Sequence, residues 1–188
     1  MENVDIDFEI PPIPLPERAS YLESYIKDGV SLAKKGKYEK AIRHLRDSKT
    51  AQEVGLHFED DARNFILTRN LTADEADRVA DKVAYNSQFN RERRSLRICE
   101  VGALGPEITG KPRPQIPQKL LQDAALIHLE EWLHALQYLT QKPLAGNEDH
   151  ELDVALYLKN QGIPLTDNFL SRHSRRKYFS EIAQPPEV

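Results

Sequence analysis

The sequence predicts a mostly helical, α+β fold: a helical hairpin, then short strands, then a compact helical domain with two adjacent helices that carry the candidate site. Apolar residues recur at helical spacing near the N-terminus and again over the last third of the chain. Short segments with strand-like patterns lie only between these two regions. With 188 residues, 39% hydrophobic and 30% charged, the chain is long enough for one domain with an appendage.

Residues 1–19 are predicted to form an extended, proline-rich arm. Closely spaced prolines favour polyproline II backbone and exclude a helix. They are Pro11, Pro12, Pro14 and Pro16. Such an arm would be a strap across the protein, a plain linker or a segment offered to a partner.

Residues 20–60 are predicted to form a helical hairpin. Apolar positions over 21–33 lie on one helical face, and Gly36 interrupts the pattern before a second helix begins over 38–45. The residues over 29–45 resemble one tetratricopeptide repeat. A single repeat cannot bury its own faces, and no second copy is visible. We therefore expect the hairpin to be a packing element of one fold or a docking platform.

Residues 61–183 are predicted to form the main α+β domain, with residues 184–188 as a frayed tail. Residues 65–68 fit a short strand or the end of a helix. A capping box at Thr72 predicts a helix to about residue 84. The alternation over 94–101 favours a strand, and the glycines and prolines that follow mark a long, turn-rich connection.

Three further helices are predicted to complete this domain. The longest covers about 118–141 and stops before Pro143. The next is expected to have Asn147 as its N-cap and to end near residue 160. The last is expected over about 167–182.

Two carboxylates and an imidazole lie on neighbouring turns of the longest helix. Glu130 and His134 are four residues apart, and Glu131 and His134 are three apart, so all three share one side of the helix. A metal ion facing this side would contact Glu130 and His134, with Glu131 beside it as the base for a bound water. The alternative is a solvated polar face carrying an ordinary surface pair. His128 lies on the apolar face and is predicted to be a hydrogen-bonded core histidine.

Acidic residues of the following helix are candidates for a third metal ligand. A short connection makes consecutive helices neighbours in space. Glu151, Glu148 or Asp153 would then face the first helix and complete a three-ligand site with one open position.

The strings EEWLH (residues 130–134) and ELDVA (residues 151–155) resemble the site-bearing segments of compact gluzincin metallopeptidases. The resemblance implies that Glu130, His134 and Glu151 are metal ligands and that Glu131 is the general base. Glu130 stands where that family has the first histidine of His-Glu-x-x-His, so the motif is degenerate. Such a ligand set would bind Zn less selectively and suit Mn or Fe better, and a degenerate site would hold no metal.

Composition and charge limit the possible partners and the expected cellular compartment. A net charge of −4 argues against a nucleic-acid partner, and the single cysteine, Cys99, permits no intrachain disulfide. Without a visible secretory signal or membrane-length apolar run, we expect a cytoplasmic protein that does not enter membranes. The leading prediction is metal-dependent hydrolysis of a peptide or protein. The alternative is a non-enzymatic scaffold that holds a protein partner with the hairpin and the proline-rich arm.

Overall fold

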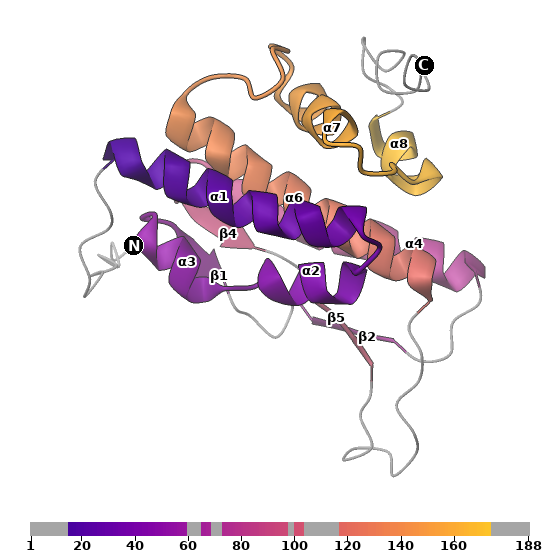
Figure 1. Ribbon diagram of the computed structural model, residues 1–188. Coiled ribbons are helices and arrows are strands. Elements are labelled where there is room, and N and C mark those ends of the chain that lie inside the picture. The colour runs from indigo at the N-terminus through magenta and orange to yellow at the C-terminus, as the bar shows by residue number, and fades with distance from the viewer. Residues whose placement is uncertain (1–14, 60–64, 69–72, 98–99, 104–116, 174–188) are drawn as a thin grey trace.

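The structure, a computed structural model, describes residues 15–59, 65–68, 73–97, 100–103 and 117–173. Most of these residues are helical, which confirms the predicted mostly α, α+β class (Figure 1). Most of the proline-rich arm, nearly all of the turn-rich connection and the C-terminal tail lie outside the described residues.

Seven helices and five strands are present in the described ranges. The helices are α1 (Leu15–Lys34), α2 (Tyr38–His44), α3 (Ser48–Glu53), α4 (Ala73–Asn86), α6 (Gln118–Thr140), α7 (His150–Asn160) and α8 (Asp167–His173). The strands are β1 (His57–Glu59), β2 (Phe65–Thr68), β3 (Gln88–Asn90), β4 (Ser95–Arg97) and β5 (Glu100–Ala103).

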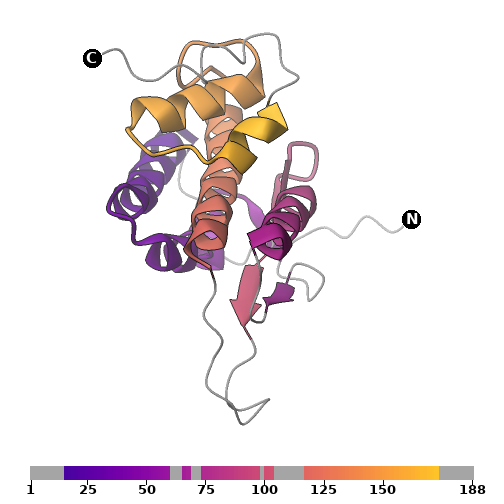
Figure 2. The ribbon, with the colours of Figure 1, turned by 90° about the vertical axis from the view of Figure 1, so that its right-hand side faces the viewer.

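Helix α6 lies at the centre of the fold. Helices α1 and α2 pack on one side of it and α4 on the other, while α7 and α8 lie across it (Figure 2). Fifteen of its 23 residues are buried, so nearly every face of the helix meets protein. A polar side chain on this helix is therefore surrounded by neighbouring elements, and these elements decide what it can bind.

The strands form two small sheets beside α6. Strand β4 is central in the first, paired in parallel with β1 and antiparallel with β3, and β2 pairs in parallel with β5 in the second. The strand predicted over 94–101 is confirmed in part. Ser95–Arg97 and Glu100–Ala103 are strands, but β4 and β5 belong to different sheets. Strands β1 and β3 have three residues each, which is too short to leave an alternating pattern in the sequence.

The N-terminal helix starts earlier than the proline pattern predicts. Helix α1 begins at Leu15, so the prediction that residues up to 19 are extended is wrong for the last five of them. Pro16 falls in the first turn of α1, where a helix needs no backbone N–H donor and tolerates proline.

The predicted hairpin forms, but its second half is broken. Helix α2 ends at His44, and α3 begins after Asp47, whose side chain accepts a hydrogen bond from the backbone of Lys49. The hairpin shares a core with α6, because the buried Trp132 donates its indole N–H to the carbonyl of Leu45 (2.7 Å). The hairpin is therefore a packing element of one fold.

Among the described residues, no helix is long and apolar enough to cross a membrane.

His128 is buried in the core, as predicted. Its Nδ1 donates to the carbonyl of Ala124 (2.6 Å), and its Nε2 has no hydrogen-bond partner among the described residues. Burial, with a smaller contribution from the charge of Arg46, lowers the pKa of His128 to about 3. The imidazole is therefore neutral in the native protein and becomes charged more readily once the chain unfolds.

We expect His128 to make the protein sensitive to acid. Its native pKa lies below the unfolded value of 6.5, so its contribution to stability is complete above pH 6.5 and is lost as the pH falls towards 3. At pH 5 the loss is about 2 kcal/mol. Urea unfolding at pH 7 and pH 5 should show that His128→Gln loses less of its free energy of unfolding on acidification than the wild type does. Equal losses in both proteins would contradict this origin.

Candidate metal centre

The polar residues of α6 lie inside the protein. Glu130 is 7% exposed and Glu131 9%, and the side chain of His134 is 12% exposed. Buried carboxylates and imidazoles need partners, because removing a charge from water is costly. The alternative of a solvated surface pair is therefore wrong for Glu130 and His134.

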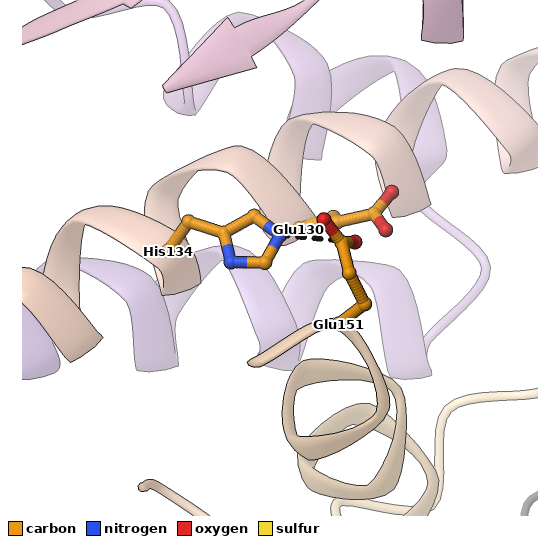
Figure 3. A group of neighbouring side chains, drawn as sticks. All are labelled: Glu130, His134 and Glu151. Atoms are coloured by element: carbon orange, nitrogen blue, oxygen red, sulfur yellow. Dashed lines mark ion pairs between the residues drawn. The ribbon is translucent and has the colours of Figure 1, made fainter. Parts of the chain in front are cut away.

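Helix α7 supplies the third member of the group. Its N-cap is Asp149, whose carboxylate accepts the backbone N–H groups of Glu151 and Leu152, so the prediction of Asn147 as the cap is wrong. This start places Glu151 in the first turn of α7, facing α6. Its carboxylate lies 3.3 Å from Nε2 of His134 (Figure 3).

Of the three acidic candidates on α7 and its approach, the structure brings Glu151 into the group. One ligand atom from each of Glu130, His134 and Glu151 lies within 4.8 Å of the others. Glu148 lines the adjoining pocket. Asp153 is fully buried and serves the connection between α6 and α7.

Asp153 organises that connection with its two carboxylate oxygens. It accepts the backbone N–H groups of Leu144, Ala145 and Asn147 at 2.6 to 3.1 Å, and the side-chain amide of Gln137 at 2.8 Å. Accepting this many hydrogen bonds satisfies the oxygens of a buried carboxylate. The loop is thereby folded onto the buried carboxylate, which fixes how α7 starts beside α6.

Gln137 fixes the orientation of His134. Its amide nitrogen donates to Asp153 and to the backbone carbonyl of His150 (3.0 Å), so its oxygen must face the imidazole. That oxygen lies 2.9 Å from Nδ1 of His134 and accepts the Nδ1 proton. Nε2 of His134 is left pointing at the carboxylates. Metal-binding histidines are held by such a second hydrogen bond, which sets the tautomer.

The carboxylates change the proton affinity of both neighbouring groups. Burial, and next the charge of Glu130, raise the pKa of Glu131 to about 8, although His134 and a backbone hydrogen bond at Phe89 act in the opposite direction. Burial acts to lower the pKa of His134, but the hydrogen bond to Glu151 and the charges of the three glutamates outweigh it and raise the pKa to about 9. The group therefore holds protons near neutral pH.

A fourth charged side chain, Arg172 of α8, reaches Glu130. Its Nη2 lies 3.6 Å from Oε2 of Glu130, and its guanidinium lies over the ring of Phe169, 5.1 Å from the ring centre. Both terminal nitrogens are buried and have no hydrogen-bond partner in the described part of the chain.

These residues line one open pocket of about 890 Å³. Its walls come from the C-terminal end of α4, from β3, from α6, from the start of α7 and from Arg172. Tyr85, Phe89 and Arg91 line the part of the pocket formed by α4, β3 and the turn after β3, and Tyr85 is 86% exposed. The pocket is large enough for a few residues of a peptide or for a ligand of similar size.

The donor atoms suit a divalent ion. Two carboxylates and one imidazole are oxygen and nitrogen donors that Zn, Mn and Fe all accept. In a tetrahedral site with bonds of about 2.1 Å, neighbouring donors lie about 3.4 Å apart. The separation of 3.3 Å between His134 and Glu151 matches this value, and the widest separation of 4.8 Å requires a small inward movement of one carboxylate.

Comparisons with protein-family models, curated proteins and solved structures found no match to this chain. The resemblances to a gluzincin metallopeptidase and to a tetratricopeptide repeat therefore remain predictions from the sequence.

Two residues of the site have no role in the sequence-based prediction. Gln137 stands three residues after His134, and this spacing was a usable signal, because side chains three apart on a helix meet. Arg172 lies in a short basic run that fits a surface patch, and its distance from Glu130 along the chain gives no sign of their contact.

Proposed function

We propose that this chain is a metal-dependent hydrolase that binds one divalent ion through Glu130, His134 and Glu151 and cleaves a peptide bond in the adjoining pocket. The observation that carries the proposal is the orientation of His134. Gln137 holds the Nδ1 proton, so Nε2 faces the two carboxylates that arrive from different helices.

A divalent ion would take the place of a proton in this group. In its absence, the proton on Nε2 of His134 bridges to Glu151. Metal binding displaces such protons, because the ligand must offer a lone pair. The mixed donor set leads us to expect Zn, Mn or Fe.

Glu131 is placed to move protons during hydrolysis. A bound divalent ion acts as a Lewis acid and makes a water molecule more acidic. Glu131 lines the same pocket, and its pKa of about 8 lies near neutral pH, where a general base can both accept and return a proton. It would take the proton from water and deliver it to the departing amine.

Metal analysis tests the first half of the proposal. Protein stripped with chelator and reloaded with Zn, Mn or Fe should hold close to one ion per chain. We expect His134→Ala to weaken binding more than about a hundredfold, since it removes a ligand, and Gln137→Leu to weaken it about ten- to a hundredfold. His150→Ala is the matched control, because this exposed histidine lines the same pocket outside the ligand group. A chain that binds no metal would overturn the proposal.

Peptide cleavage tests the second half. The loaded protein should hydrolyse members of a fluorogenic peptide library. Glu131→Gln should retain the metal while its rate falls about a hundredfold or more, the usual loss when a general base is removed. Full metal loading without cleavage of any peptide would reject the hydrolytic role and retain the metal site.

A further inference from the structure

The candidate metal group and Arg172 share one carboxylate. Glu130 contributes a ligand atom to the group formed with His134 and Glu151, and its Oε2 also lies 3.6 Å from Nη2 of Arg172. The widest separation in the group, 4.8 Å, means that ligands must move inward around an ion. A bound ion and Arg172 therefore compete for the same carboxylate.

The terminal N–H groups of Arg172 lack hydrogen-bond acceptors among the described residues. Its side chain is 21% exposed, and its terminal nitrogens are buried. The ring of Phe169 supports the guanidinium from one side, and the carboxylate of Asp123 is near enough to interact with its charge. Buried N–H donors that remain unsatisfied cost free energy, so an outside oxygen anion that reaches them is bound favourably.

We propose that Arg172 binds a carboxylate of the ligand that occupies the pocket, in the place that Glu130 leaves when the metal binds. The planar, forked guanidinium matches a carboxylate. This inference rests on the proposed metal site and deepens it. It assigns the substrate class as a peptide or acyl compound that carries a free carboxylate close to the reacting bond.

The charge of the pocket opposes a doubly charged anion more strongly than a singly charged one. Six acidic and two arginine side chains line it, so a doubly charged phosphate is repelled even after a divalent ion has bound. A carboxylate carries one charge, which one guanidinium neutralises. We therefore assign a carboxylate to this position, and inorganic phosphate serves as the competing probe.

The first experiment tests whether a bound carboxylate tightens the binding of Zn²⁺. Zn²⁺ affinity is measured by competition with a chromophoric chelator in N-acetylglycine and in its uncharged match, N-acetylglycinamide. We expect the carboxylate to tighten Zn²⁺ binding about fivefold or more in the wild type, and the amide to have no effect. Arg172→Gln should still bind Zn²⁺ but lose this coupling. Equal coupling in both proteins would assign the carboxylate to the metal alone and overturn the role of Arg172.

A metal-free arm separates this inference from the metal proposal. Glu130→Gln removes the charge that holds Arg172, and the isosteric amide preserves packing. In this variant, the Nε–H NMR signal of Arg172 is assigned by its loss in the double variant Glu130→Gln/Arg172→Gln. N-acetylglycine should shift this signal, and N-acetylglycinamide should not. If the wild type binds no Zn²⁺ but this shift is observed, the metal site is rejected and the carboxylate site at Arg172 is retained. No shift, or tighter binding of inorganic phosphate than of N-acetylglycine, would overturn the carboxylate assignment.

Discussion

Asp153→Ala should destabilise the protein by about 4 kcal/mol, because it leaves one buried and three part-buried donors without an acceptor. The wild-type carboxylate accepts three backbone N–H groups of the α6–α7 connection and the amide of Gln137. Alanine offers none of these oxygens, and the part-buried loop must rearrange before its N–H groups can turn to water. Urea unfolding followed by far-UV circular dichroism measures the loss.

Asp153→Asn is the matched control for this prediction. It keeps the shape and one acceptor oxygen but places an NH₂ group against donors, so we expect roughly half of the alanine effect. A loss below about 1 kcal/mol in Asp153→Ala would show that the network contributes little. Both variants should also bind metal more weakly than the wild type when folded, because Gln137 loses its anchor and His134 its fixed orientation.

The chain of contacts from Asp153 to His134 links the fold to the site. Asp153 positions Gln137, Gln137 orients the imidazole, and the folded loop brings Glu151 to the same place. A cluster of acidic side chains on a surface needs no such arrangement. This chain of contacts makes metal binding a better explanation than a solvated ion pair.

The sequence predicts the two site-bearing helices because their signals are local. The apolar pattern of α6 is long, and its stop before Pro143 is read from neighbouring residues. The spacing of Glu130 and His134 places them on one side of the helix whatever the rest of the chain does. The short connection between the helices predicts only that an acidic residue of α7 lies near His134. The structure was needed to select Glu151 from the three candidates.

Other features depend on contacts that no local pattern reports. Arg172 meets Glu130 because α8 folds back over α6. Asn147 and Asp149 are equally good N-caps by composition. The structure uses Asp149 as the cap, while the Asn147 side chain accepts the backbone N–H of Asp149 and so supports the turn before α7. Similarly, proline favours an extended arm only until the first turn of α1 begins, where the same residue is tolerated.

The alternative function as a scaffold is constrained by the packing of the hairpin. Gly29 lies where an added Cβ would be 2.9 Å from Cδ2 of Leu45, so α1 and the end of α2 approach closely. Leu45 in turn accepts the hydrogen bond from Trp132 of α6. The inner face is therefore occupied by this chain itself, and a partner would have only the outer face of the hairpin. No observation on the described residues favours such a partner.

Trp132→Ala should cost about 4 kcal/mol, because it removes the anchor between the hairpin and α6. Trp132 is fully buried, meets the ring of Tyr25 edge-on with centres 5.0 Å apart, and donates its indole N–H to Leu45. Alanine leaves a cavity and an unsatisfied carbonyl inside the core. Because Trp132 is the only tryptophan, the unfolding of the variant is followed in urea by circular dichroism.

Trp132→Phe separates packing from hydrogen bonding. Phenylalanine keeps most of the apolar contact with Tyr25 but cannot donate to Leu45, so we expect a smaller loss of about 2 kcal/mol. The indole occupies the opposite side of α6 from the metal group, since it contacts the hairpin while Glu130, Glu131 and His134 line the pocket. Zn²⁺ affinity of the folded phenylalanine variant should therefore match the wild type. A large drop in affinity with little loss of stability would mean that the hairpin contributes directly to the site, and the two faces of α6 could no longer be treated as independent.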